Sequence, residues 1–258
     1  MIHHIVTGRG PNVICLHGWG GSTDSFLGLA RALSDKYTVT LVDFNGFGRS
    51  PEPTRPFSLD DYVLSLLEIV RHYKMESFSL VCHSFGGRVG IKFCYKFGYL
   101  VDKLILVDSA GMKPRRLPKY FYSLYRHKLL NLLKIKHEAG SSDYKKLSPV
   151  MKKTFVSIVN EHLESCAEYV KVPTLLVWGN KDKETPVYMG KRLLRLIKGS
   201  EMVLFCGCGH FSYLERHSVF AAAVRAFLSG EQNEMDRGVP CFLPARRRIV
   251  TISDFITK

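Results

Sequence analysis

Ser84 lies where a strand-like apolar run breaks and a helix-like pattern begins. The surrounding sequence is LVCHSFGG (80–87), and an amphipathic pattern follows over 88–97. A sharp strand-to-helix turn fits this change: it holds the serine in a strained backbone conformation with its hydroxyl facing a cleft, and Gly86 leaves room for the bend. Such an exposed hydroxyl suits nucleophilic catalysis, although a serine that only caps a helix would give a similar local pattern.

An acid and a histidine follow two later strand-like runs. The acid is in WGNKD (178–182) and the histidine in GCGHF (207–211), while an earlier run ends in the glycine-rich loop HGWGG (17–21), which can turn a backbone N–H outward. The order serine, acid, histidine is the chain order of a Ser-His-Asp triad built on a parallel sheet. The residues therefore predict acyl transfer through a nucleophilic serine.

The elements that must position these residues alternate along the chain. Short apolar runs predict strands, and apolar residues at helical spacing predict the helices between them. The predicted strands are 2–7 (an edge strand), 13–16, 38–42, 78–81, 103–107, 174–178 and 202–205, and the predicted helices are 24–33, 59–73, 88–97, 187–197 and 218–228. This alternation indicates an α/β fold with a mostly parallel central sheet and helices on both faces. In such folds the active site lies beyond the carboxyl ends of the strands.

The alternation is interrupted between 110 and 173. That span is helical in pattern and basic, with interleaved tyrosines and leucines, and predicts a helical cap inserted over the sheet. After Gly230 the pattern fades, apart from a short final strand predicted at 248–252. The expected organisation is a core of 1–110 and 173–229, a cap (lid) of 111–172 and a C-terminal extension of 230–258.

Over residues 2–229 the sequence resembles the α/β-hydrolase fold superfamily, in its capped branch of serine hydrolases. The loop DFNGFGRS (43–50) is similar to the Asp-x-x-Gly-x-Gly-x-Ser loop of that branch, and Pro186 and Glu215 follow the acid and the histidine as they do there. One position departs from the pattern, because Cys82 stands where the turn usually has glycine. The resemblance implies an α/β-hydrolase fold with a helical cap.

The catalytic roles follow from chemistry. Ser84 is the predicted nucleophile and His210 the general base that takes its proton and returns it to the leaving group. Asp182 is expected to hold the imidazole in the required tautomer. The backbone N–H groups of Trp19 and Phe85 are the predicted oxyanion hole.

Other polar residues near these motifs have alternative interpretations. Asp108, after the strand at 103–107, is a rival for the role of the acid. His17 is expected to order the glycine loop, His83 to fill space at the turn, and Asp43 to fix its own glycine turn through side-chain to backbone bonds.

Four aromatic side chains are expected to line the substrate pocket. They are Trp19, Phe85, Phe211 and Tyr122, the last one from the insertion; packing within the core is the alternative role for each. The favoured substrate is a small-molecule carboxylic ester. A serine at the turn argues against the epoxide hydrolases and dehalogenases of this fold, which use aspartate. A carbon–carbon bond hydrolase, an acyltransferase and a hydrolase-like receptor without turnover stay open as alternatives.

The charge composition limits which binding partners are expected. The net charge is +14, and between 112 and 165 twelve Lys and Arg stand against four acids. Weak association with an anionic membrane surface is one reading of this excess, and a basic, solubilising surface is the other. Nucleic acid is not an expected partner.

Cysteine usage and the N-terminus indicate the compartment. The seven cysteines have no metal-binding spacing, so neither a metal nor a cofactor is expected. No apolar run approaches the roughly 18 residues of a membrane helix, and a strand-like segment begins at once after Met1, without a signal-peptide pattern. These features predict a cytoplasmic protein.

Overall fold

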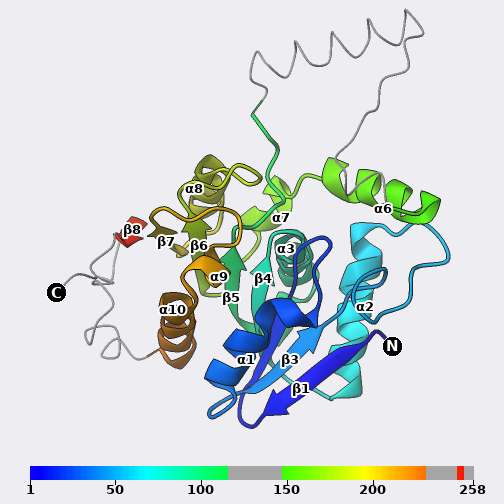
Figure 1. The fold of residues 1–258 in the computed structure, drawn as a ribbon, viewed down its shortest axis with the longest axis horizontal. Coiled ribbons are helices and arrows are strands. Elements are labelled where there is room, and N and C mark those ends of the chain that lie inside the picture. The colour runs from blue at the N-terminus through cyan, green and yellow to red at the C-terminus, as the bar shows by residue number, and fades with distance from the viewer. Residues whose placement is uncertain (116–146, 231–248, 253–258) are drawn as a thin grey trace, which may run out of the picture.

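The computed structural model describes residues 1–115, 147–230 and 249–252, and Figure 1 shows its fold. In these residues, eight strands form one sheet in the order β1-β3-β2-β4-β5-β6-β7-β8. β1 runs antiparallel to β3, and every other neighbouring pair is parallel. The strands are β1 (His4–Gly8), β2 (Asn12–Leu16), β3 (Thr38–Val42), β4 (Phe78–His83), β5 (Val101–Val107), β6 (Thr174–Gly179), β7 (Glu201–Phe205) and β8 (Ile249–Ile252). The predicted mostly parallel sheet with an edge strand at its N-terminal end is confirmed.

Helices connect the strands as the sequence predicts, with two differences at their starts. The described helices are η1 (Thr23–Phe26), α1 (Leu27–Leu33), α2 (Leu59–His72), α3 (Phe85–Phe97), η2 (Gly98–Leu100), α6 (Pro149–Asn160), α7 (Glu164–Glu168), α8 (Val187–Leu196), α9 (Ser212–Glu215) and α10 (His217–Ser229). The helix predicted at 24–33 opens as a 3₁₀ turn, because the side chain of Ser22 accepts a hydrogen bond from the Asp24 amide and starts a tighter turn there. The helix predicted from 88 begins at Phe85, directly after Ser84.

The helices cover both faces of the sheet. α1 and α10 lie on one face, and α2, α3 and α8 lie on the other (Figure 1). Successive residues of β2 show the reason: Val13 and Cys15 pack with α1 and α10, whereas Ile14 and Leu16 pack with α2, α3 and α8. Because strand residues alternate between faces, a strand covered on both sides is mostly apolar along its whole length.

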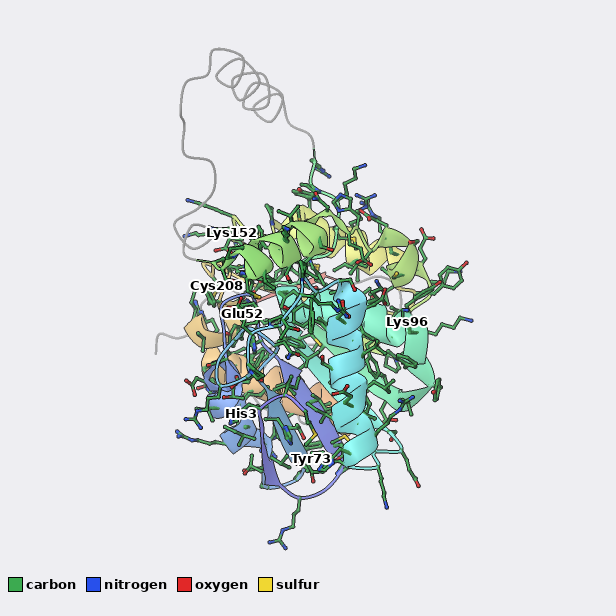
Figure 2. The ribbon with its side chains drawn as sticks, turned by 90° about the vertical axis from the view of Figure 1, so that its right-hand side faces the viewer. His3, Glu52, Tyr73, Lys96, Lys152 and Cys208 are labelled. Carbon is green, nitrogen blue, oxygen red and sulfur yellow. The ribbon has the colours of Figure 1, made fainter. Side chains whose placement is uncertain are left out.

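Part of the predicted insertion is described and consists of α6 and α7. α6 begins at a Ser148 cap followed by Pro149, a favoured arrangement at a helix start. It is held to the loop before α2, since Ser148 contacts the Glu52 carboxylate and the Thr154 hydroxyl accepts a hydrogen bond from the Phe57 amide at 2.9 Å. In Figure 2, α6, which carries Lys152, lies across the top of the fold above α2. The predictions for 116–146 fall outside the described residues.

The C-terminal extension contributes a strand to the core sheet. β8 pairs in parallel with β7, with Met202 opposite Ile249 and Phe205 opposite Ile252. This agrees with the strand predicted at 248–252. Across the described ranges, no helix combines the length and the apolar character that a bilayer-spanning helix needs.

Gly86 marks the closest approach between the turn after β4 and the end of β2. A Cβ at this position would come within 2.3 Å of the Leu16 carbonyl oxygen and 2.8 Å of the His17 carbonyl oxygen, and neither can move without disturbing the sheet. The Gly86 amide also donates to the His17 carbonyl at 3.1 Å. The turn therefore needs glycine for space.

We expect Gly86→Ala to lower the free energy of unfolding by about 1–3 kcal/mol, the usual cost of overpacking. Gly98→Ala is the matched control, because Gly98 has ordinary helical angles and open space where its Cβ would lie. It should leave stability unchanged or raise it by about 0.4–1 kcal/mol. Chemical denaturation measures both variants, and equal effects would contradict this account of the turn.

Candidate active site

Ser84 sits between β4 and α3 in a conformation that few non-glycine residues adopt. Its φ is 48° and its ψ is −108°, so the backbone is strained. The surrounding main chain holds it there: the Ser84 amide donates to the Val107 carbonyl at 3.0 Å, and the Ser84 carbonyl accepts from the Gly87 and Ala110 amides, each at 3.0 Å. The strain expected from the sequence is present, and it directs the side chain into a cavity.

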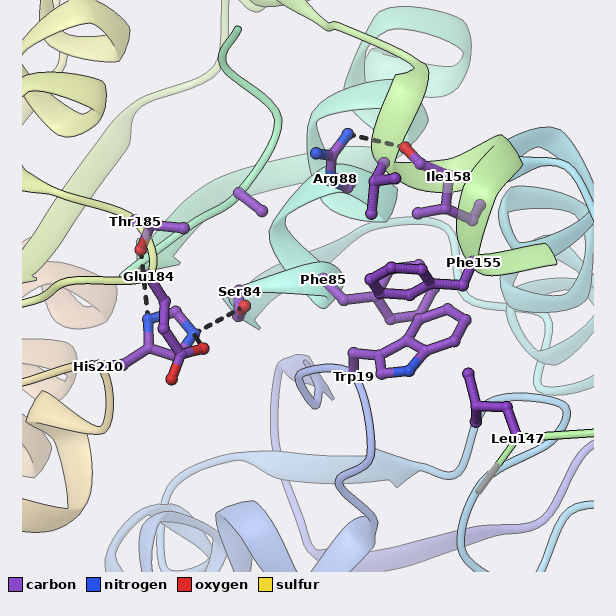
Figure 3. Close-up of a pocket in the computed structure, with 12 residues that line it drawn as sticks. Trp19, Ser84, Phe85, Arg88, Leu147, Phe155, Ile158, Glu184, Thr185 and His210 are labelled. Atoms are coloured by element: carbon purple, nitrogen blue, oxygen red, sulfur yellow. Dashed lines mark hydrogen bonds and ion pairs between the residues drawn. The ribbon is translucent and has the colours of Figure 1, made fainter. Parts of the chain in front are cut away.

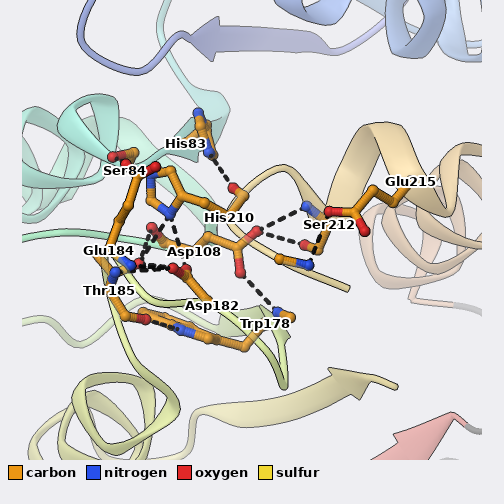
Figure 4. A network of polar contacts seen from close by, with 12 residues as sticks. His83, Ser84, Asp108, Trp178, Asp182, Glu184, Thr185, His210, Ser212 and Glu215 are labelled. Atoms are coloured by element: carbon orange, nitrogen blue, oxygen red, sulfur yellow. Dashed lines mark hydrogen bonds and ion pairs between the residues drawn. The ribbon is translucent and has the colours of Figure 1, made fainter. Parts of the chain in front are cut away.

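The structure brings Ser84, His210 and Asp182 together from three separate strand ends (Figure 4). Ser84 Oγ lies 2.9 Å from His210 Nε2, and His210 Nδ1 lies 2.9 Å from Asp182 Oδ2. With its proton on Nδ1, His210 donates to the carboxylate and accepts from the serine hydroxyl. The arrangement has the geometry needed to withdraw a proton from Ser84.

The loop after β6 holds the Asp182 carboxylate in place. Its Oδ1 accepts hydrogen bonds from the amides of Glu184 at 2.8 Å and Thr185 at 3.0 Å, and its Oδ2 accepts from Thr185 Oγ1 at 2.7 Å. Trp178, fully buried, fixes the same loop by donating from its indole to the Thr185 carbonyl at 2.7 Å. Asp182 thus faces His210 on a rigid support.

The contact between Asp182 and His210 shifts the pKa values of the two residues in opposite directions. Burial alone would raise the pKa of Asp182, but its hydrogen bonds to His210 and Thr185 outweigh burial and lower it. Burial alone would lower the pKa of His210, but the Asp182 carboxylate, with the nearby charge of Glu184, raises it above the ordinary 6.5. Asp182 is therefore charged over the working range, and His210 gains basicity.

Activity should fall on the acidic side through a pKa above 6.5, because only neutral His210 accepts the Ser84 proton. Glu184 Oε2 lies 3.4 Å from His210 Nε2 and adds to the increase in pKa. Glu184→Gln should therefore move the acidic limb of kcat/KM to lower pH.

A pH profile of kcat/KM from 5 to 9 would test both statements. Because the Glu184 side chain is 68% exposed, solvent screens its charge, and the shift should shrink further as salt is added. Glu215→Gln is a suitable control, since Glu215 binds the Gly209 amide and not the imidazole. An acidic limb that stays in place in Glu184→Gln would contradict the assignment.

Asp108, the rival acid, is engaged elsewhere. Its Oδ1 accepts from the Gly179 amide at 2.8 Å, and its Oδ2 accepts from the Ser212 amide at 3.2 Å and the Ser212 hydroxyl at 2.5 Å. Burial raises its pKa to about 7. The carboxylate of Asp108 thus joins the loop that carries Asp182 to the segment after His210, and the geometry favours Asp182 as the partner of the histidine.

Two histidines predicted to be structural have structural contacts. His17 accepts from the Phe44 amide at Nε2, 3.1 Å away, so its Nδ1 carries the proton and donates to the Gly18 carbonyl at 2.7 Å. His83 Nε2 donates to the His210 carbonyl at 2.8 Å. Burial lowers the pKa of both rings, that of His83 to about 3, so His83 stays neutral.

Asp43 binds its own turn, as expected. Its carboxylate accepts from the amides of Thr23 at 2.5 Å and Arg49 at 2.9 Å, and it also contacts His3 Nδ1 at 2.8 Å. A Cβ at Gly48 would come within 2.3 Å of this carboxylate. The loop beside the cavity is therefore fixed by a buried acid that has no contact with Ser84 or His210.

The amides of Trp19 and Phe85 are available as oxyanion donors. In the described part of the chain, neither donates to a backbone or side-chain acceptor. Phe85 is the first residue of α3, where the helix leaves its initial amides free. The rings of Trp19 and Phe85 pack edge to face, with centroids 5.4 Å apart.

Two cavities meet at Ser84 and His210. The larger, of about 360 Å³, extends beneath α6 (Figure 3). Besides those two residues, its lining includes Trp19, Phe85, Arg88, Leu147, Phe155 and Ile158. The smaller, of about 90 Å³, is bordered by Phe211 and Tyr213. Three of the predicted pocket residues, Trp19, Phe85 and Phe211, thus line a cavity, and Tyr122 lies outside the described residues.

Sequence reasoning missed three residues of the site. Glu184 and Thr185 follow Asp182 directly, and Arg88 lies one helical turn after Ser84. Helical spacing from the nucleophile could have pointed to Arg88, whereas the contacts of Thr185 depend on how its loop folds back. In the residues that the structure describes, no group of three His, Cys, Asp or Glu side chains is arranged to hold a metal ion.

Comparison with known proteins gives consistent matches. Residues 11–123 match the family model of the alpha/beta hydrolase fold, and residues 154–241 match the model of a TAP-like protein. Serine hydrolase-like protein 2 of Homo sapiens is 28% identical over 237 residues, which cover 89% of this chain and 73% of the human protein. A 2-hydroxy-6-oxo-6-(2'-aminophenyl)hexa-2,4-dienoic acid hydrolase of Metapseudomonas resinovorans is 27% identical over 255 residues, which cover 88% of this chain and 87% of that protein.

Solved structures agree with this fold. The esterase from Exiguobacterium antarcticum superposes with a TM-score of 0.73 at 21% identity, covering 88% of this chain and 95% of the esterase. The chain belongs to the α/β-hydrolase fold superfamily. By class it is an α/β hydrolase, and the relatives that it matches are themselves named as hydrolases or hydrolase-like proteins.

Proposed function

We propose that the protein is a serine hydrolase that cleaves carboxylic esters of small molecules through an acyl-enzyme intermediate. The observation that carries this proposal is the continuous chain from Ser84 Oγ through His210 to Asp182, with both contacts at 2.9 Å. Ser84 and His210 also line a cavity of about 360 Å³. A strained serine with its hydroxyl bonded to a buried imidazole is the arrangement that nucleophilic catalysis requires.

The first half of the reaction forms the acyl-enzyme. Ser84 Oγ attacks the carbonyl carbon while its proton moves to His210 Nε2, and Asp182 stabilises the imidazolium that results. The carbonyl oxygen becomes an oxyanion, which the amides of Trp19 and Phe85 are proposed to bind. When the tetrahedral intermediate collapses, the ester C–O bond breaks and His210 returns the proton to the departing alcohol.

The second half of the reaction repeats these steps with water. His210 takes a proton from a water molecule, the resulting hydroxide attacks the acyl carbon, and the bond to Ser84 Oγ breaks with return of the proton. The smaller cavity beside Phe211 is the proposed place for the alcohol, because the leaving oxygen must lie near His210 Nε2. The larger cavity is then left for the acyl part.

We also propose that 111–172 forms the cap of this enzyme. α6 supplies Phe155, Ile158 and Val159 to the lining of the larger cavity. The Trp19 and Phe155 rings pack edge to face at 5.0 Å, so the glycine loop and α6 meet over the nucleophile. In this proposal the cap excludes water from the acyl part and sets which acyl chains fit.

Rapid-mixing assays with p-nitrophenyl esters of increasing acyl length would test the proposal. We expect a burst of p-nitrophenol equal to the enzyme concentration when deacylation is slow, followed by steady turnover. An added primary alcohol that diverts the acyl group at high yield would reassign the protein as an acyltransferase. Folded protein that produces no p-nitrophenol would reject the esterase proposal and favour a receptor.

A carbon–carbon bond hydrolase is the second candidate, because homologues of this chain include hydrolases of that class. The relative from Metapseudomonas resinovorans, 27% identical, is named as a hydrolase of a substituted 2-hydroxy-6-oxo-dienoic acid. The same serine and histidine would serve either bond. Assaying a 2-hydroxy-6-oxo-dienoic acid beside the ester series separates the two candidates: a larger kcat/KM for the dienoic acid than for every ester would favour the second.

A further inference from the structure

Arg88 lines the same cavity as Ser84 and is almost entirely buried. It lies in α3, four residues after the nucleophile, and both residues line the larger cavity. Only 8% of the residue is exposed. In Figure 3 its guanidinium is drawn above Ser84, between the nucleophile and α6. A positive charge therefore lines the cavity that holds the nucleophile, beside apolar side chains from α6.

Within the described residues, only part of the Arg88 guanidinium is hydrogen-bonded. Nη1 donates to the Ile158 carbonyl at 2.9 Å and to the Glu161 carbonyl at 2.6 Å, at the end of α6. A guanidinium has five N–H donors, and among the described residues these two carbonyls are the acceptors that Arg88 has. No carboxylate of the described residues lies within ion-pair distance of it.

The two acids whose charges act on the pKa of Arg88, Glu161 and Glu164, have other partners. Glu161 Oε1 binds Lys92 Nζ at 2.5 Å. Glu164 Oε1 accepts from the Lys113 amide at 2.7 Å and pairs with Arg192 at 3.1 Å. Burial lowers the pKa of Arg88 to about 10 against the opposing effect of these two acids, so the guanidinium is charged at neutral pH. A buried charge without a paired acid is costly unless a ligand supplies the counter-charge.

We propose that Arg88 binds a carboxylate on the acyl part of the substrate, so that the protein acts on half-esters of short dicarboxylic acids. The inference rests on the proposed ester hydrolysis and names its substrate class. A guanidinium binds a carboxylate through paired N–H donors. Trp19 and Phe155 would pack against the methylene groups between the ester and the acid.

Glu184 would orient such a substrate. Its carboxylate lies beside His210, and in Figure 3 it is drawn on the other side of Ser84 from Arg88. A substrate carboxylate is repelled from the Glu184 end and attracted to the Arg88 end, so the ester carbonyl remains at Ser84. A neutral acyl chain of equal length has neither preference.

Binding to the Ser84→Ala protein tests the inference without turnover. The probes are monomethyl glutarate and its uncharged isostere, in which a carboxamide replaces the carboxylate. Isothermal titration should give about 10- to 100-fold tighter binding of the acid, the range for a hydrogen bond to a charged group. Adding Arg88→Gln should remove this preference, because glutamine keeps an N–H donor but carries no charge.

Two further variants make the comparison specific. Adding Arg88→Lys to Ser84→Ala keeps the charge but loses the paired geometry and should retain part of the preference. Adding Arg195→Met instead, on the exposed face of α8, removes one positive charge away from the cavity and should leave the preference unchanged. Thermal unfolding of each variant verifies that it is folded.

Kinetics of the protein with Ser84 intact separate this inference from the proposed function. The substrates are the p-nitrophenyl half-ester of glutaric acid and the corresponding glutaramic ester, and the quantity compared is the ratio of their kcat/KM values. We expect Arg88→Gln to lower this ratio about 10- to 100-fold. A residue that only ties α3 to α6 would lower both values together.

The binding and kinetic results test the carboxylate site separately from the ester hydrolysis. Equal binding of the two probes, or a preference that survives Arg88→Gln, would overturn the carboxylate site even if neutral esters are hydrolysed. Preferential binding of the acid that disappears in Arg88→Gln would support the site even if no ester turns over, and in that case the ester hydrolysis alone would be rejected.

Discussion

Ser84→Ala is expected to abolish covalent labelling by a fluorophosphonate and to lower kcat for esters on the order of 10⁶-fold. The physical reason is that the serine hydroxyl is the only atom of this residue that reaches His210 Nε2. Without it no acyl-enzyme forms, and the remaining acceleration comes from binding and the oxyanion donors. Alanine keeps the backbone, which the Val107 carbonyl and the Gly87 and Ala110 amides hold.

Ser109→Ala is the matched control for this experiment. Ser109 is fully buried and lies against Gly87 of the turn. Its hydroxyl donates to the Ala110 carbonyl at 2.9 Å, and among the described residues it has no histidine partner. Labelling should persist in this variant and vanish in Ser84→Ala, as read by gel fluorescence and intact mass. A folded Ser84→Ala protein that still reacts at one site would place the activated nucleophile on another residue.

Asp182→Asn should lower kcat on the order of 10⁴-fold while the fold is retained. An asparagine amide in place of Oδ2 would present an N–H to His210 Nδ1 and so stabilise the wrong tautomer, with no proton acceptor on Nε2. The loss of the negative charge would also remove the main cause of the raised pKa of His210. The residual activity should therefore have its acidic limb at lower pH than the wild type.

Asp108→Asn is the comparison that decides between the two acids. Asp108 binds Gly179 and Ser212 and not the imidazole, and its pKa of about 7 means that the neutral form is already accessible near neutral pH. We expect less than about a 10-fold loss in kcat, from displaced loops rather than lost chemistry. A larger loss in Asp108→Asn than in Asp182→Asn would reverse the assignment of the acid.

The charges around the cavity give these variants a common interpretation. Glu184 lies beside His210 and Arg88 lies against the end of α6, so two opposite charges line the cavity that holds Ser84. Substitution of Glu184 should shift the pH profile. Substitution of Arg88 should alter the choice of substrate, and substitution of Asp182 should lower kcat. Because each variant affects a different measured quantity, the three roles can be separated on one panel of esters.

The sequence by itself determined the α/β architecture and the positions at which chemistry could occur. Short, continuous apolar runs predict buried strands of a parallel sheet from the sequence alone. Ser84, Asp182 and His210 each follow such a run closely. Parallel strands bring their carboxyl ends to one edge, so the approximate meeting of these residues follows from topology. The glycine at 86 was likewise readable, because only a residue without a side chain permits the approach to β2.

Only the tertiary structure decided which acid faces the histidine and what else lines the cavity. Asp108 and Asp182 both follow strands, and the choice depends on loop paths that bring Gly179 and Ser212 to Asp108 and Thr185 to Asp182. Arg88 reads as an ordinary helix residue until α6 folds over it and leaves its charge without a paired acid in the described chain. Local pattern determines where a strand ends, whereas side-chain partners depend on packing between segments that are distant in sequence.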